Sequence, residues 1–342
     1  MKSFASIKVF FPRSLLNGIA IVFALLLVAV GYYWQQLNSP MNVTRAEIFE
    51  VPPGASLNQI SNSLVSKGYL ANPGLLINWA RFTGRAGEIK AGEYELLETT
   101  SPRQLLSKMV AGEIKQYQLT LVEGWTLQQA LQLIWDSPGI SPSLQGVSAT
   151  EIARSLKLEY AHAEGLFFPD TYYYSGGTSD TDILERAQIR LEDILQRLWR
   201  ERAGALPYKT PYEALIMASI IEKESSEASE RGHIAGVFVR RLERGMRLQS
   251  DPTVIYGLAE RYDGNITRSS LDEVTLYNTY RINGLPPTPI ALAGRQSIEA
   301  SLNPLPSEYL YFVAKGDGSH YFSNTLEQHN EAVRRFQKNV SN

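Results

Sequence analysis

An uncharged apolar run near the N-terminus is the plainest pattern in the chain. Residues 15–34 carry no charged side chain, and about 20 apolar residues are enough to cross about 30 Å of hydrocarbon as a helix. The run predicts a transmembrane anchor at residues 15–34. A short N-terminal segment (1–14) precedes it, and a polar linker (35–45) follows it.

The flanks of this run predict its orientation. Lys2, Lys8 and Arg13 precede it without any acidic residue, so the N-terminus is expected in the cytoplasm and the rest of the chain outside the cytoplasmic membrane. A cleaved secretory signal is the alternative, but such signals have a shorter apolar region and a cleavage site of small residues. Here the run is long and ends in three large aromatics at 32–34, which favours a retained single-pass anchor.

Hydrophobic periodicity then predicts a small α+β unit at residues 46–122. Three segments have the pattern of strands: Ile48–Val51, Ala91–Leu96 and Tyr117–Val122. Three helices are expected: after Ser56, with Gln three residues later as a capping box, over Pro73–Phe82, and after Ser101, with Pro at the first helical position.

A larger mixed α+β unit is predicted at residues 123–342. Its helix signals are a capping pattern at Thr126, an amphipathic stretch at 182–202, a strong start at Thr210, a stretch at 230–244 and a start near Thr325. Its strand candidates are Tyr309–Ala314 and His320–Phe322, separated by a glycine-rich turn. The predicted class is therefore α+β, with an N-terminal transmembrane helix and two units.

Composition and the absence of known motifs exclude several classes of function and of catalytic site. A chain of 342 residues with 44% hydrophobic content is large enough for two cores. Its net charge of −2 gives no support to nucleic-acid binding. There is no cysteine, which excludes thiolate catalysis and cysteine-bound metals. None of the four histidines has the H-E-x-x-H spacing of a zinc hydrolase, and no G-x-S-x-G, P-loop or G-x-G-x-x-G occurs.

Two carboxylates end the helix that starts at Thr210. Residues 214–221 are almost wholly apolar, and Glu222 and Glu224 follow at once. Glu224 continues the apolar stripe of Met217, Ile220 and Ile221 by helical spacing. Burial against such a surface raises the pKa of a carboxyl, as a general acid requires near neutral pH. On periodicity alone, a solvated helix end explains the two glutamates at least as well.

Three later stretches mix amide, hydroxyl and aromatic groups, a combination that suits sugars but also occurs in ordinary loops. They are residues 248–257, 277–280 and 284–290. Gln249, Tyr256, Tyr277 and Asn278 are the candidates in them for binding a sugar. A glycosidase that uses water needs a second carboxylate, for which Asp251, Glu164 and Asp170 are available.

These stretches also carry a family resemblance. The chain resembles the YceG-like (MltG) family of endolytic murein transglycosylases from the membrane anchor to the last helix. The blocks that carry the resemblance are 164–172, 218–225, 248–257, 277–280, 284–287 and 309–314. Residues 288–294 depart from the family's pattern after the Pro-Pro pair, which leaves the shape of that loop open.

The resemblance implies a LysM-like subdomain at 46–122 and a catalytic domain at 123–342. It implies a lyase of the bacterial inner membrane whose periplasmic part cleaves nascent peptidoglycan strands between N-acetylmuramic acid and N-acetylglucosamine. Glu224 matches the family's catalytic glutamate, with Glu222 as the fallback. One glutamate would act as acid and then as base, leave a 1,6-anhydro end and need no metal or other cofactor. Contact with penicillin-binding proteins is implied in the same way.

Two other functions fit the residues. A membrane-anchored scaffold could bind glycan without cleaving it. A muramidase could cleave with water, and its product would be one water heavier than an anhydro product.

Overall fold

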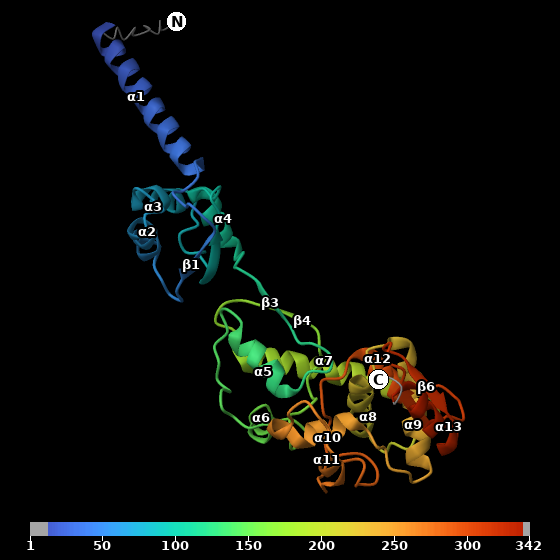
Figure 1. Ribbon diagram of the computed structural model, residues 1–342. Coiled ribbons are helices and arrows are strands. Elements are labelled where there is room, and N and C mark those ends of the chain that lie inside the picture. The colour runs from blue at the N-terminus through green and yellow to red at the C-terminus, as the bar shows by residue number, and fades with distance from the viewer. Residues whose placement is uncertain (1–12, 338–342) are drawn as a thin grey trace, which may run out of the picture. The chain divides into compact units, whose positions relative to one another are not determined.

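The computed structural model describes residues 13–337. It has two compact units, divided between Gln116 and Tyr117 (Figure 1). Each unit has its own hydrophobic core, and each is described by itself below. Lys2 and Lys8, on which the predicted orientation partly rests, lie outside the described residues.

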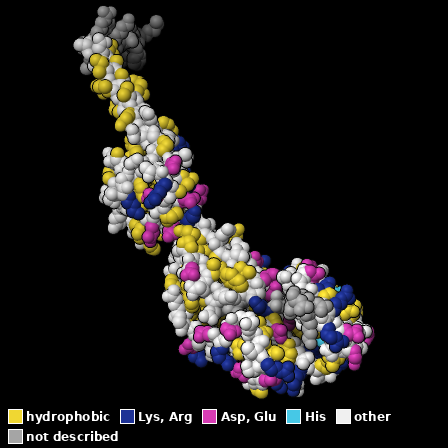
Figure 2. Space-filling model, in the orientation of Figure 1, with side chains coloured by type: hydrophobic (Ala, Val, Ile, Leu, Met, Phe, Trp, Pro, Cys, Tyr) yellow, Lys and Arg dark blue, Asp and Glu magenta, His cyan; other side chains and the backbone are white. Residues whose placement is uncertain are grey.

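The first unit begins with the long helix α1 (Arg13–Asn38). Its stretch Leu16–Asn38 is long and apolar enough to cross a membrane, which agrees with a single-pass anchor. Hydrophobic side chains cover the visible face of this helix (Figure 2) and are largely exposed. The last turns behave differently, because Leu37 is completely buried in the unit that follows.

The rest of the first unit packs three helices against a two-stranded antiparallel sheet. Its elements are β1 (Glu47–Val51), α2 (Leu57–Ser66), α3 (Pro73–Phe82), β2 (Gly92–Leu96) and α4 (Pro102–Ala111). The capping box predicted at Ser56 is present, and the helix start predicted at Ser101 also has a capping box. The sheet register places Phe49 opposite Tyr94, and both rings are buried in the core.

The second unit is mostly helical, with two further antiparallel strand pairs. Its helices are α5 (Leu127–Asp136), α6 (Ala149–Ser155), α7 (Asp180–Arg200), α8 (Pro211–Glu224), α9 (Arg231–Glu243), α10 (Asp251–Leu258), α11 (Arg268–Asp272), α12 (Arg295–Leu302) and α13 (Leu326–Phe336). Its strands are β3 (Tyr117–Thr120), β4 (Thr171–Tyr174), β5 (Tyr311–Ala314) and β6 (His320–Ser323). β3 pairs with β4, and β5 pairs with β6.

Helix α8 lies at the centre of the second unit. Every residue from Ala214 to Ile221 is buried, and the helix packs against α7, α9, α10 and α12. A helix with apolar residues on all sides is stable only when it is covered on all sides. This explains why the run 214–221 has no polar face.

The mixed helical and stranded composition predicted from the sequence is confirmed. The sequence placed the boundary between the units after Val122, whereas the pairing of β3 with β4 joins Tyr117–Thr120 to the second unit. The LysM-like character of the first unit stays a prediction.

Candidate active site

Glu224 is the last residue of α8. Thr210 caps the start of the helix by accepting a hydrogen bond from the backbone N–H of Glu213, and Pro211 occupies the first turn. The helix ends where Ser225 turns to an extended conformation. Glu224 therefore stands where a buried helix meets the wall of a cavity.

The cavity has a volume of about 490 Å³. Its lining residues come from the end of α8, from α9, from the segment around residue 250, from Tyr280, and from β5, β6 and α13. They are Glu224, Arg241, Gln249, Asp251, Tyr280, Tyr311, Phe312, Val313, Ala314, His320, Leu326, His329, Asn330, Val333 and Gln337.

Two opposing effects set the pKa of Glu224. Burial is the larger effect and raises the pKa, which lies at about 7 against an ordinary 4.5 once all effects are combined. Ser250 opposes it, because its hydroxyl donates a hydrogen bond to the carboxylate. Asp251 raises the pKa further and Arg241 lowers it. The carboxyl of Glu224 can therefore hold or release a proton near neutral pH.

Arg241 supplies the buried positive charge of the cavity. Its Nε donates to the carbonyl of Leu310 at 2.7 Å, and its Nη1 donates to the carbonyl of Leu248 at 2.6 Å. The guanidinium also lies over the ring of Tyr311, at 5.2 Å. Burial lowers the pKa of Arg241, but a guanidinium stays charged in proteins.

Asp251 is paired with a neighbour rather than free in the cavity. The hydroxyl of Tyr280 donates to its Oδ1 at 2.6 Å. Burial and this hydrogen bond raise the pKa of Tyr280, so the phenol stays protonated and continues to donate. The second carboxyl of the cavity thus has a fixed orientation.

Glu222 has a different environment from Glu224. Its Oε1 accepts a hydrogen bond from Arg231 of α9 at 3.0 Å, and its Oε2 accepts one from the backbone N–H of Gly294 at 2.9 Å. The side chains of Glu222 and Arg231 are only 4% and 8% exposed. This carboxylate joins α8 to α9 and to the segment before α12.

The four residues predicted to bind a sugar are placed differently from one another. Among the described residues, Gln249 lines the cavity, whereas Tyr256, Tyr277 and Asn278 are not in its wall. Tyr256 and Tyr277 pack edge to face, 4.8 Å apart. The hydroxyl of Tyr256 donates to Glu164 at 3.1 Å.

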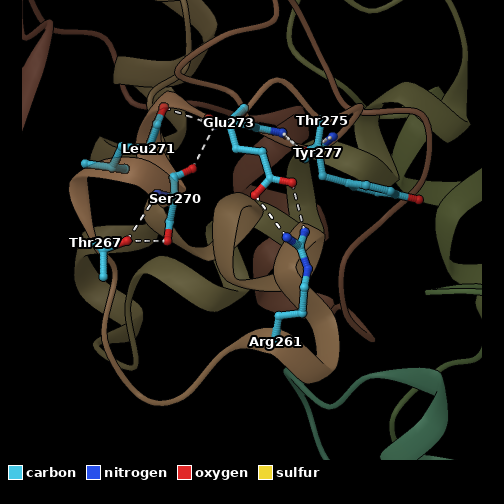
Figure 3. Close-up of polar contacts among 8 residues, drawn as sticks. Arg261, Thr267, Ser270, Leu271, Glu273, Thr275 and Tyr277 are labelled. Atoms are coloured by element: carbon cyan, nitrogen blue, oxygen red, sulfur yellow. Dashed lines mark hydrogen bonds and ion pairs between the residues drawn. The ribbon is translucent and has the colours of Figure 1, made fainter.

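Asn278 is buried and holds the loop around it. Its side-chain amide donates to the backbone carbonyls of Ser270, Leu271 and Glu273. Figure 3 shows the same loop from the side of Arg261, whose guanidinium faces the carboxylate of Glu273 at 3.0 and 3.2 Å. These contacts fix the loop that leads to Tyr280.

Glu164 is the other buried carboxyl near this region. It accepts hydrogen bonds from the backbone N–H of Leu127 at 2.8 Å and from Tyr256. Burial raises its pKa to about 7. Glu164 thus joins the start of α5 to α10.

Sequence reasoning missed Arg241 and His320 as cavity residues. A signal for Arg241 existed, because it follows Ile234 and Phe238 at helical spacing and so places a charge on an apolar stripe. For His320 the sequence shows only that it lacks the spacing of a zinc ligand. Its Nδ1 lies 2.7 Å from Glu230 Oε2, and this partner is too far away in the sequence for any local pattern to reveal it.

The comparisons with known proteins agree with this architecture. The YceG-like family matches residues 49–335. This chain belongs to the YceG-like family. Membership of that family, expected from the motif blocks, is thereby confirmed.

Three relatives illustrate the match. An endolytic murein transglycosylase of Bacillus subtilis (strain 168) is 29% identical over 303 residues, covering 84% of this chain and 83% of the relative. One from Streptococcus pneumoniae (strain D39) is 29% identical over 357 residues, covering 92% of this chain but 63% of the relative. The crystal structure of a yceG-like protein from Listeria monocytogenes is 32% identical, with a TM-score of 0.52, and covers 84% of this chain and 99% of that one.

Proposed function

We propose that this YceG-like protein is a lytic transglycosylase that cleaves within the glycan strands of peptidoglycan. The support is its family membership and its relatives, which are named endolytic murein transglycosylases. The observation that carries the chemistry is Glu224, a carboxyl with a pKa of about 7 in the wall of a cavity. A general acid works best when its pKa lies near the operating pH.

Glu224 acts first as an acid. Its carboxyl proton passes to the glycosidic oxygen between N-acetylmuramic acid and N-acetylglucosamine, and the bond from C1 to that oxygen breaks. The acetamido group of the substrate stabilises the oxocarbenium-like centre, as in other substrate-assisted glycosidases. No nucleophile from the protein is required in this step.

Glu224 then acts as a base. The carboxylate takes the proton of the C6 hydroxyl, and the C6 oxygen closes on C1. The product has a 1,6-anhydro end, no water is consumed, and Glu224 is protonated again for the next cycle. Ser250 and Arg241 favour the carboxylate form between the two steps.

The cavity offers groups that suit a sugar chain. Gln249 presents an amide at the cavity wall, a group that suits the hydroxyls of a sugar, and Tyr311 positions Arg241 there through its ring. Tyr256, Tyr277 and Asn278, proposed from the sequence for the same task, do not line this cavity. We assign them to holding α10 and the loop before Tyr280 in position.

One substitution tests the proposal. Glu224→Gln keeps the size of the side chain and removes the titrating proton, so the purified full-length variant should yield no anhydro ends from isolated glycan strands. Mass analysis of the products separates the outcomes, because a hydrolytic product is heavier by one water. Wild-type cleavage by Glu224→Gln would exclude this residue. A wild-type protein that binds strands without shortening them would favour a glycan-binding scaffold.

We also propose the location and partners that go with this activity. Helix α1 anchors the chain in the bacterial inner membrane with its N-terminus in the cytoplasm and the residues after α1 in the periplasm. The first unit is a LysM-like glycan-binding unit, and penicillin-binding proteins that make new strands are the expected partners. Membrane extraction and protease protection of either terminus test the topology.

A further inference from the structure

The outer end of α1 is built into the first unit. Leu37 is completely buried, and the hydroxyl of Tyr33 donates to the backbone carbonyl of Leu75 in α3 at 2.9 Å. Helix α1 packs against both α3 and α4, an arrangement that Figure 1 shows at the lower end of α1. The proposed membrane helix and the small unit are therefore joined by packing as well as by the chain.

An aromatic cluster continues from α1 onto α3. Trp34 meets Trp79 edge to face at 5.6 Å, and Trp79 stacks with Phe82 at 6.0 Å. Phe82 is 84% exposed, although single exposed hydrophobic residues are common on protein surfaces. What distinguishes Phe82 is its place at the end of a line of aromatics that begins on the membrane helix.

The position of Trp34 gives the depth of this cluster. The apolar run ends at this residue, and the polar residues Gln35 and Gln36 follow it; Trp and Tyr gather where a spanning helix leaves the hydrocarbon. Trp79 and Phe82 follow Trp34 at stacking distances. If α1 spans the bilayer, these two rings lie at the level of the lipid headgroups.

Basic residues flank the cluster along the chain. Residues 66–87 include Lys67, Arg81 and Arg85 and no acidic residue. Arg81 and Arg85 are exposed on either side of Phe82. Arg103 of α4 lies over the rings of Trp34 and Trp79, at 5.0 and 5.9 Å. Arginine binds phosphate well, and clustered basic residues are attracted to anionic membranes.

We propose that the α1–α3 junction docks on the surface of the bilayer that α1 enters. The junction consists of Trp34, Trp79, Arg81, Phe82, Arg85 and Arg103. Phe82 and Trp79 enter the headgroup region, and the arginines contact the phosphates of anionic phospholipids. This inference rests on the proposed membrane anchor, and it assigns a membrane-binding face to a unit that the resemblance links only to glycan.

The absence of cysteine from the sequence makes a direct test simple. Single-cysteine variants of the full-length chain are labelled with an environment-sensitive fluorophore and reconstituted in vesicles of phosphatidylcholine and phosphatidylglycerol. The vesicles contain lipids that carry a quencher near the headgroup or along the acyl chain. Phe82→Cys reports on the junction. Ala24→Cys, in the middle of α1, reports on the anchor.

A matched control separates docking from simple closeness to the membrane. Asn58 is exposed in the first turn of α2, at the opposite end of that helix from Tyr69 and Leu70, which lie beside α1. We expect headgroup quenchers to quench the label at 82 several-fold more strongly than the label at 58. Acyl-chain quenchers should act mainly on the label at 24.

Charge reversal tests the role of phosphate. Adding Arg81→Glu and Arg85→Glu to the Phe82→Cys variant should lower headgroup quenching toward that of Asn58→Cys. In vesicles of phosphatidylcholine alone, headgroup quenching of the label in Phe82→Cys should fall in the same way. In the Ala24→Cys variant, neither the two charge reversals nor the change of lipid should alter the quenching of the label.

Equal quenching at 82 and 58, with the label at 24 quenched by acyl-chain lipids, overturns the docking proposal and leaves the anchor intact. No quenching at 24 overturns the anchor and the docking together. A third outcome is strong quenching at 82 that both the charge reversals and the loss of anionic lipid leave unchanged. That result overturns the assignment of anionic phosphate as the ligand.

Discussion

The hydroxyl of Ser250 donates a hydrogen bond to Oε1 of Glu224, with 2.5 Å between the two oxygens. This hydrogen bond joins the residue before α10 to the last residue of α8. The bond favours the carboxylate, whereas burial favours the neutral acid. The balance leaves the pKa of Glu224 at about 7, where a residue that must first give and then take a proton can do both.

Ser250→Ala removes the donor and should raise the pKa of Glu224. A hydrogen bond to a charged group contributes about 1.5–3 kcal/mol, so the shift should be about one pH unit or more. The acid form would then persist to higher pH. We expect the falling alkaline limb of kcat/KM for glycan cleavage to move to higher pH by that amount.

Ser66→Ala is the control for this prediction, because Ser66 is an exposed residue at the end of α2. Its pH profile should match that of the wild type. An alkaline limb that stays in place in a folded Ser250→Ala variant would show that Ser250 does not tune the group that limits the rate.

Arg231→Met should destabilise the second unit strongly. It removes the ion-pair partner of Glu222, whose side chain is only 4% exposed, and leaves a buried charge without its partner. Breaking a buried pair in this way costs about 3–5 kcal/mol. Urea unfolding of the full-length chain, followed by far-UV circular dichroism, should show a lower midpoint for the second unit.

Arg295→Met is the matched control for this ion-pair prediction. Arg295 pairs with Glu299 at 2.7 Å, but the two side chains are 48% and 40% exposed, and such pairs contribute about 0–1 kcal/mol. Equal effects of Arg231→Met and Arg295→Met would contradict the structural role of the buried pair. Glu222→Gln should likewise lose stability, whereas Glu224→Gln should lose activity and keep the fold.

Glu164 should make stability depend on pH. Its pKa is about 7 in the folded chain against an ordinary value of 4.5, so the folded state keeps a proton that the unfolded state releases. The unfolding free energy should therefore fall as pH rises from about 4.5 to about 7, by about 3 kcal/mol in total. Below that window the contribution of Glu164 is constant.

Glu164→Gln removes this titration and should flatten part of the slope. Thermal midpoints measured at about pH 5 and about pH 8 bracket the window. Glu224 titrates in the same direction, so some slope should remain in the variant. Glu159→Gln, at an exposed position, should behave as the wild type, and an unchanged slope in Glu164→Gln would contradict the assignment.

Local signals in the sequence predicted many of the elements correctly. The capping boxes at Ser56 and Ser101 mark the starts of α2 and α4, and Pro73–Phe82 is α3. The apolar run 214–221 is buried throughout, as expected. These features depend on neighbours within a few residues, which is the range that a sequence pattern covers.

The cavity was harder to foresee. The stretch 248–257 has a polar and aromatic composition, yet residues 251–258 form the helix α10, and its tyrosine at 256 does not line the cavity. Asn278 has the composition of a sugar ligand but uses its amide to hold its own loop. The type of a residue does not reveal where its side chain points, because that depends on the packing around it.

By itself, the sequence determined that this chain has a membrane-spanning candidate helix, two mixed units and the motif blocks of its family, and it singled out Glu224. Apolar periodicity, capping and motif spacing are properties of adjacent residues, so they can be read directly. Only the tertiary structure decided that Glu224 accepts a hydrogen bond from Ser250 and lines one cavity with Arg241, while Glu222 pairs with Arg231. Burial and charge at a site come from segments that are distant along the chain, and folding alone brings them together.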